Sequence, residues 1–316
     1  MVGASPKGTG AEGVLKLIGK TPIFRLAKIT PSSWAEVWAK WEGANPTGSM
    51  KDRMALSMIE GAEKRGQLKP GETVVEYTGG STGSSLAMVC AAKGYRSHFI
   101  SSDAFAEEKI ATMRALGSTV DIVPSSDKKF TPELFQEMIS RTRVLSEEPG
   151  TFWTDQFNNQ DSKEGYHMMA EETVEQLQEF DAFVMSAGTG GCFSGNAEVF
   201  KEHMDDIRCV AVEPAASRHL SGGPLGGHRI EGIGPGFIPK IMRMDLVDEI
   251  IAVSDEEAYD TARGLASKEG VFGGISSGAN VFAALKLAKE LGQGRRIVTV
   301  IVDSGLRYLD GDLFHQ

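Results

Sequence analysis

The sequence predicts an α/β fold with two lobes, each an open, mainly parallel sheet flanked by helices. Apolar, strand-like runs alternate with helical segments from Thr73 to Val302. Such alternation favours parallel strands whose connecting helices cover both faces of a sheet. The length of 316 residues exceeds the size at which one hydrophobic core usually stops growing, so two lobes are expected.

Composition narrows the class of protein. Hydrophobic residues at 41% and charged residues at 24% are ordinary for a globular protein. A net charge of −10 argues against nucleic acid or an anionic membrane surface as the main partner. The first residues contain no signal-peptide core, and no apolar run approaches the roughly eighteen residues of a membrane span. We therefore expect a cytoplasmic protein with reduced thiols. Because the three cysteines and six histidines lack ligand spacing, no metal site is predicted.

The first elements lead to a lysine. Residues 35–41 alternate apolar and polar side chains like a half-buried strand, and Pro46 and Gly48 then break the pattern. A helix is predicted to begin near Lys51. A lysine at the positive end of a helix and partly out of water holds its proton less firmly and is a better amine nucleophile. Taken alone, Lys51 also fits an ordinary surface lysine.

The alternation continues through the middle of the chain. Here we predict strands 73–77, 97–101 and 119–123, helices 84–93 and 106–116, and a further helix opened by Thr131-Pro132. A second series has helices 164–177 and 193–204 and strands 182–186 and 208–212. Glycines break up residues 221–236, which indicates a long loop that lines something. A capping box at Ser254–Glu257 opens a helix to about residue 268, and helix 279–291 precedes strand 296–302.

Three glycine-rich loops lie at strand ends or helix starts, where open α/β sheets bind ligands. Thr78-Gly-Gly-Ser-Thr-Gly83 offers backbone N–H groups and hydroxyls to a carboxylate, and Gly188-Thr-Gly-Gly-Cys192 offers them to a phosphate. Gly273-Gly-Ile-Ser-Ser-Gly278 precedes a helix. Each also fits a simple turn or helix cap. The second loop lacks the lysine of a nucleotide P-loop, which disfavours ATP, and Phe193 replaces the third glycine of a dinucleotide fingerprint.

Together, Asn45-Pro-Thr-Gly-Ser-Met-Lys-Asp-Arg53, Thr78–Gly83, Gly188–Gly191 and Gly274–Gly278 resemble the motifs of the cysteine synthase/cystathionine β-synthase family. The resemblance covers nearly the whole chain. It implies pyridoxal-phosphate enzymes of fold type II, in which a smaller lobe is inserted into a larger cofactor-binding one. The expected bounds are 41–149 for the smaller lobe, 11–40 with 150–316 for the larger, and a mobile tail at 1–10. The resemblance also implies a homodimer.

The resemblance assigns a role to each motif. Lys51 would form the Schiff base with pyridoxal 5′-phosphate. The cofactor would also be held by Ser81, by the phosphate loop and by Ser276, which faces the pyridine nitrogen; the phosphate loop consists of Gly188, Thr189, Gly190, Gly191 and Cys192. The substrate carboxylate would contact Thr78, Gly79, Gly80, Thr82 and Gln156.

The implied reaction is β-replacement on an activated serine, namely O-acetylserine, O-phosphoserine or serine. Lys51 would remove the α-proton, a β-leaving group would depart to leave an aminoacrylate, and sulfide or a thiol would add. Two positions depart from the family pattern: Ser81 stands where asparagine is usual, and Cys192 where threonine is usual. Alternatives are a serine/threonine dehydratase or racemase, or a catalytically impaired cofactor-binding relative.

Overall fold

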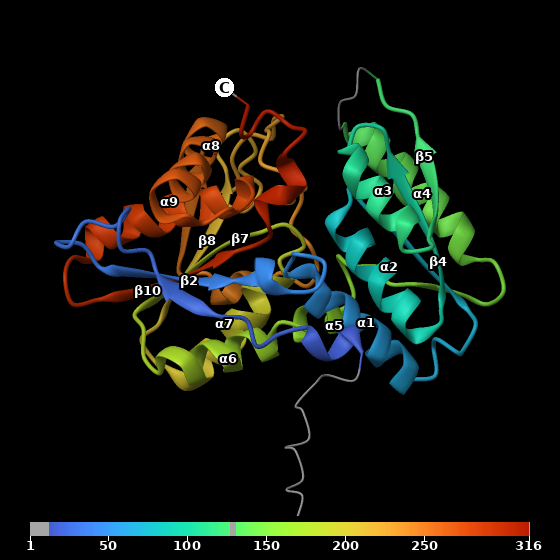
Figure 1. Cartoon of the computed structure of the whole chain (residues 1–316), viewed down its shortest axis with the longest axis horizontal. Helices are drawn as coiled ribbons and strands as arrows, with labels where there is room; N and C mark the ends of the chain where they lie inside the picture. Colours follow the sequence, from blue (N-terminus) through green and yellow to red (C-terminus); the bar gives the residue numbers. More distant parts are fainter. Residues whose placement is uncertain (1–12, 127–130, 316) are drawn as a thin grey trace, which may run out of the picture.

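A computed structural model describes residues 13–126 and 131–315, which form two β-sheets with helices on both faces (Figure 1). The predicted tail at 1–10 lies outside the described residues. Within these ranges, no helix combines the length and the apolar character that crossing a membrane requires.

The larger sheet has six strands. In spatial order these are β1 Ile23–Arg25, β2 Glu36–Trp41, β10 Arg296–Ile301, β7 Ala182–Ser186, β8 Arg208–Pro214 and β9 Glu249–Val253. Only the β1–β2 pair is antiparallel, so the expectation of a mainly parallel sheet is confirmed. Alternate side chains of each strand face opposite sides. Val184 and Val210 pack with the layer of α8 (Asp255–Gly264) and α9 (Ile275–Leu291). Phe183 and Cys209 pack with the opposite layer of α6 (His167–Leu177) and α7 (Gly191–His203).

The smaller sheet has four parallel strands in the order β5 Thr119–Val123, β4 Arg96–Ser102, β3 Thr73–Tyr77 and β6 Thr151–Trp153. Strand β6 pairs with β3, although it follows residue 149, where we expect the smaller lobe to end. This pairing extends the smaller sheet by a few residues beyond that bound. The lobe bounds themselves stay a prediction.

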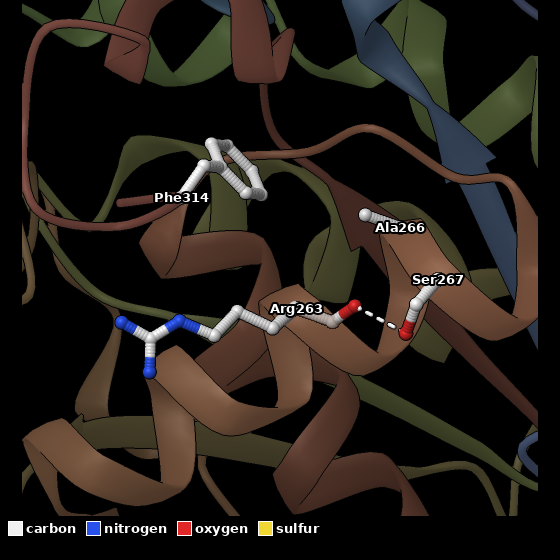
Figure 2. Close-up of a pocket in the computed structure, with 4 residues that line it drawn as sticks. All are labelled: Arg263, Ala266, Ser267 and Phe314. Atoms are coloured by element: carbon white, nitrogen blue, oxygen red, sulfur yellow. Dashed lines mark hydrogen bonds between the residues drawn. The ribbon is translucent and has the colours of Figure 1, made fainter. Parts of the chain in front are cut away.

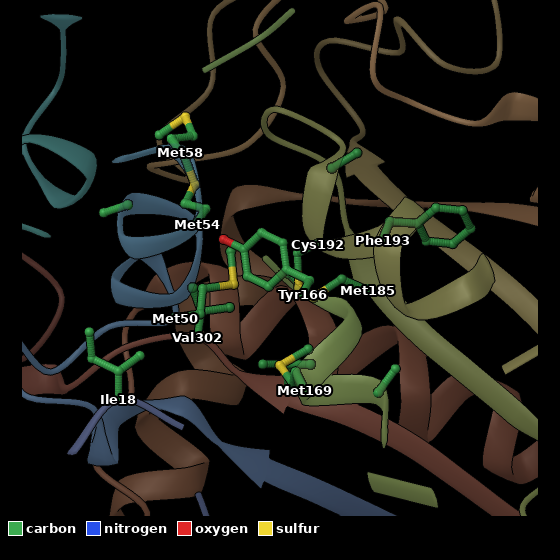
Figure 3. Close-up of a cluster of buried hydrophobic side chains, with 14 of the residues drawn as sticks. Ile18, Met50, Met54, Met58, Tyr166, Met169, Met185, Cys192, Phe193 and Val302 are labelled. Carbon is green, nitrogen blue, oxygen red and sulfur yellow. The ribbon is translucent and has the colours of Figure 1, made fainter. Parts of the chain in front are cut away.

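The helices are α1 Lys51–Lys64, α2 Ser81–Lys93, α3 Glu107–Ala115, α4 Pro132–Ser146, α5 Gln160–Glu164, α6 His167–Leu177, α7 Gly191–His203, α8 Asp255–Gly264 and α9 Ile275–Leu291. One hydrophobic cluster joins α1 and α2 beside the smaller sheet to α6 and α7 beside the larger one. Figure 3 shows its centre, where Met50 and Met54 of the α1 segment face Tyr166, Met169 and Cys192. The two sheets therefore share a continuous core.

Local packing explains two differences from the predicted elements. The helix expected over 164–177 is divided into α5 and α6, and Gly165 lies at the division. A Cβ on Gly165 would lie 2.9 Å from the Arg53 carbonyl oxygen. The backbone at Gly165 therefore packs directly against the backbone of α1, which leaves no room for a side chain. Helix α8 has the expected capping box but continues from Leu265 to Glu269 as a wider π-helical turn. The loop predicted over 221–236 contains no helix or strand.

Candidate active site

The start of α1 is held against the carboxyl end of β10. Met50 N donates to Val302 O at 2.9 Å, Ser304 N donates to Gly48 O at 2.9 Å, and Ser49 pairs with Asp303. These contacts place Lys51 at the edge of the larger sheet where open α/β folds bind ligands.

Lys51 is the central ionisable group of this region. Its side chain is partly buried, and Nζ forms no hydrogen bond or ion pair with the described residues. Desolvation lowers the pKa of Lys51, and ionisation of the neighbouring Cys192 or Asp303 would oppose that shift. An amine with a lowered pKa and no internal partner is suited to attack a carbonyl carbon and to carry a proton.

Asp303 is a neighbour of Lys51 that the motif reading did not single out. The carboxyl group is buried, and burial raises its pKa. Tyr308 Oη donates to Asp303 Oδ2 at 2.8 Å, whereas Asp303 Oδ1 is buried and accepts no hydrogen bond within the described residues. The available signal was position, because Asp303 lies two residues after the end of the apolar strand β10.

The first glycine loop is held by internal hydrogen bonds and leaves other N–H groups free. Thr78 Oγ1 accepts from Gly80 N at 2.9 Å and from Gly83 N at 3.1 Å. Gly80 has a φ of 133°, a conformation that favours glycine. Three further N–H groups, those of Gly79, Ser81 and Thr82, make no hydrogen bond with the described residues. Free N–H groups at the start of α2 suit a carboxylate.

Thr82 and Gln156, which are distant in sequence, meet beside this loop. Thr82 Oγ1 donates to Gln156 Oε1 at 2.8 Å, and Gln156 Nε2 donates to Tyr77 O at 3.1 Å. Gln156 N in turn donates to the buried carboxylate of Glu76 at 3.0 Å. The predicted substrate residues therefore lie together in the structure.

The second glycine loop has the geometry of an anion cradle. A Cβ on Gly188 would lie 2.2 Å from the Gly232 carbonyl oxygen, so only glycine fits there. Within the described residues, the backbone N–H groups of Gly188, Thr189, Gly190, Cys192 and Phe193 at the start of α7 have no hydrogen-bond partner. Such a cluster at a helix N-terminus fits a phosphate.

Cys192 contributes little charge to this cradle. Its side chain is buried, and burial raises the pKa of the thiol, so the sulfur stays protonated. Asn196 Nδ2 lies 3.7 Å from Cys192 Sγ. Because a thiol is a weak donor, the backbone is the main recognition element of this loop.

The third loop separates a structural serine from a free one. Ser277 Oγ accepts from Val302 N at 2.9 Å and joins α9 to β10. Ser276 is buried in the first turn of α9, and its hydroxyl has no hydrogen-bond partner among the described residues. The structure thus leaves Ser276 available to a ligand atom.

Ser81 has a neighbour that motif reading missed. Arg307 Nη1 lies 3.4 Å from Ser81 Oγ, and Arg307 Nη2 donates to Thr47 O at 2.5 Å. The guanidinium group therefore links the first turn of α2 to the segment before Lys51. No local pattern pointed to this contact, because Arg307 is 226 residues away from Ser81 in the chain.

A separate cavity of about 380 Å³ lies elsewhere, against α8 and the end of the chain (Figure 2). Arg263, Ala266, Ser267 and Phe314 line it, and none of the predicted site residues does. Among the described residues, the unpaired Lys51 amine, the free N–H groups of the second glycine loop and the free Ser276 hydroxyl fit the carbonyl, phosphate and ring nitrogen of pyridoxal phosphate.

Comparison with known proteins agrees with this donor set. Residues 14–303 match the family model described as pyridoxal-phosphate dependent enzyme. The chain is 41% identical to a cysteine synthase of Staphylococcus aureus (strain Mu50 / ATCC 700699) over 308 residues, 96% of this chain and 97% of the relative. It is also 41% identical to a probable cysteine synthase of Bacillus subtilis (strain 168), over 94% of this chain and 96% of the relative.

Solved structures show the same likeness over nearly the whole chain. An O-ureido-L-serine synthase superposes with a TM-score of 0.91 at 35% identity, covering 96% of this chain and 95% of that one. A cysteine synthase from Entamoeba histolytica superposes with a TM-score of 0.90 at 34% identity, covering 100% and 94%. The chain therefore belongs to the pyridoxal-phosphate dependent enzymes of fold type II, within the cysteine synthase/cystathionine β-synthase family.

Proposed function

We propose that this chain catalyses β-replacement on an activated serine, O-acetylserine, O-phosphoserine or serine, with sulfide or a thiol as the nucleophile. The observation that carries the proposal is the Lys51 amine, whose pKa is lowered and which has no partner among the described residues, together with two glycine loops whose free N–H groups suit anions. The cysteine synthases among the relatives support the same reaction class.

Different residues are assigned to different groups of the cofactor and the substrate. We assign Lys51 to the cofactor carbonyl, Ser276 to its ring nitrogen and Ser81 to its phenolic oxygen. The phosphate is assigned to the loop made by Gly188, Thr189, Gly190, Gly191 and Cys192. The substrate carboxylate is assigned to Thr78, Gly79, Gly80, Thr82 and Gln156, whose N–H, hydroxyl and amide groups suit an anion.

Pyridoxal phosphate, when bound, supplies an electron sink for the electron pair left on the substrate's α-carbon. The chain supplies the proton transfer: Lys51 Nζ, as a neutral amine, takes the α-proton. Desolvation favours the neutral form of Lys51, and the buried Asp303 carboxyl lies close enough to influence its charge. A neutral hydroxyl at Ser276 leaves the ring nitrogen weakly protonated, which favours elimination over transamination.

The direct test is product formation by the purified, cofactor-loaded protein. O-acetylserine, O-phosphoserine and serine are each supplied with sulfide, and cysteine is measured. Formation of cysteine from one of them supports the proposal. Release of a keto acid or a D-amino acid without use of sulfide would instead identify a dehydratase or racemase, and turnover of none of the three would refute β-replacement.

We also propose a cytoplasmic homodimer. The buried, unpaired thiols of Cys90, Cys192 and Cys209 support a reducing compartment. The homodimer rests on the family resemblance alone. Sedimentation at micromolar concentration tests it, and a purely monomeric protein would contradict it.

A further inference from the structure

The Lys109–Glu231 ion pair joins a helix of the smaller sheet's side of the molecule to a loop of the larger sheet's side. Lys109 belongs to α3 and is 5% exposed, whereas Glu231 lies in the loop at 215–243 and has a side chain that is 45% exposed. Lys109 Nζ contacts Glu231 Oε2 and also lies 5.0 Å from the centre of the Tyr308 ring. The pair therefore connects the smaller sheet's helices to a loop that follows β8 of the larger sheet.

One partner of this pair, Lys109, and the chain neighbour of the other, Gly232, pack on the two glycine loops. A Cβ on Gly80 would lie 2.5 Å from Lys109 Cβ, so the lysine stem lies directly on the first loop. On the other side, Gly232, next to Glu231, lies on the second loop, because a Cβ on Gly188 would come within 2.2 Å of its carbonyl oxygen. The ion pair is thus a short physical link between Gly80 and Gly188.

A second contact joins the same two parts of the molecule. Phe237, in the loop at 215–243, lies with its ring centre 6.0 Å from that of Phe135 and 5.4 Å from that of Phe157. Phe157 stacks on Tyr77 at 6.0 Å, directly before Thr78. The loop therefore docks on the smaller sheet through one polar and one apolar contact.

We infer that the Lys109–Glu231 pair is a positioning clamp that fixes the separation of the two glycine loops. If the proposed function holds, this separation sets the substrate carboxylate site relative to the cofactor phosphate site. Neither side chain is assigned to touch a reacting atom. Lys109 acts through the first loop, on which its stem packs, and Glu231 acts through the adjacent Gly232, which packs on the second loop.

The test uses two single variants, Lys109→Met and Glu231→Gln, and the double variant that combines them. Lys109→Met keeps an apolar stem on Gly80 and removes the charge. Lys93→Met is the matched control, because Lys93 forms a 2.8 Å pair with Glu63 elsewhere. We expect each single variant to raise KM for the amino-acid substrate about tenfold while kcat changes less than about twofold. The double variant should be no worse than either single variant. Glu231→Asp should recover part of the loss, and Lys93→Met should leave KM unchanged.

A structural readout is independent of the reaction. Trypsin cleavage after the exposed Arg229, two residues before Glu231, should be faster in both single variants and unchanged in Lys93→Met. Faster cleavage in a protein without β-replacement activity would support the clamp and refute the proposed function. Unchanged cleavage, or costs that add in the double variant, would overturn the clamp even in an active enzyme.

Discussion

The first turn of α1 carries two cations in opposite surroundings. Arg53 is fully buried and paired, with Glu42 at 2.7 Å and Glu172 at 2.8 Å. The same cluster holds Lys40, whose Nζ contacts Glu172 at 2.9 Å and donates to Thr21 O at 2.8 Å. Lys51, two residues before Arg53, has no such partner in the part of the chain that the structure describes. Burial alone therefore does not mark a reactive lysine.

The comparison separates two uses of a buried positive charge. Burial lowers the pKa of both Lys40 and Lys51, but the Glu172 carboxylate partly offsets the shift in Lys40. A buried cation surrounded by carboxylates holds structure, and its charge is already compensated. A partly buried amine without a partner keeps its lone pair accessible for chemistry. The difference lies in the missing partner.

The largest effect is expected from Lys51→Ala. Because this variant removes both the amine that holds the cofactor and the group that moves the α-proton, kcat should fall at least about a thousandfold. The visible absorbance of the lysine-linked cofactor should disappear, and circular dichroism should be unchanged. Lys51→Arg should not restore activity, since a guanidinium stays protonated. Cofactor-dependent turnover by Lys51→Ala without an added amine would show that another lysine does this work.

Breaking the paired side of the turn should destabilise the folded protein instead. Arg53→Met leaves Glu42 buried with a charge and fewer partners, which costs about 3–5 kcal/mol in the free energy of unfolding. Urea titration of the apoprotein measures this loss. Arg25→Met is the control, because Arg25 pairs with Glu36 at an exposed site and should cost less than about 1 kcal/mol. Equal costs for the two variants would remove the contrast between buried and exposed pairs.

Ser276→Ala should have a smaller effect. It removes the hydroxyl assigned to the ring nitrogen and keeps Lys51, so we expect kcat to fall by roughly tenfold or less with the cofactor still bound. Absorbance titration gives cofactor affinity, and steady-state rates give kcat. Ser277→Ala is the matched comparison, because it deprives Val302 N of its acceptor and should reduce stability. A Ser276→Ala loss as large as that of Lys51→Ala would contradict the assigned role.

The smallest predicted effect tests the comparison between Lys51 and Lys40. In the apoprotein at neutral pH, Lys51→Met should raise the free energy of unfolding by about 1 kcal/mol, whereas Lys40→Met should lower it by a similar amount. The folded pKa of Lys51 is lowered, so the unfolded chain binds more protons between the folded and unfolded pKa values. The wild-type apoprotein therefore gains stability as pH rises through that window, and Lys51→Met should lose part of this gain. Urea titrations from pH 7 to 10 measure it.

Local pattern was enough to predict much of this molecule. Strands 73–77, 119–123 and 182–186 were predicted to the residue, because turn residues bound each apolar run. Strands β1, β6 and β9 were not predicted. Strands β1 and β6 have only three residues each and offer little pattern, and β9 depends on its pairing with β8. The same limit applies to Asp303, Arg307 and the Lys109–Glu231 pair. Their partners are brought near by the fold, and single-sequence periodicity does not report such contacts.

The hydrophobic cluster shared by the two sheets has a thermodynamic consequence. Met50 and Met54 pack against Tyr166 and Met169, so separating the lobes would expose apolar surface on both. Two bodies that share a core do not unfold independently, and the apoprotein should melt in a single cooperative transition whose calorimetric and van't Hoff enthalpies agree. Thermal unfolding would then disrupt the candidate site and the fold in the same transition, because the segment that carries Lys51 lies on the surface where both sheets meet.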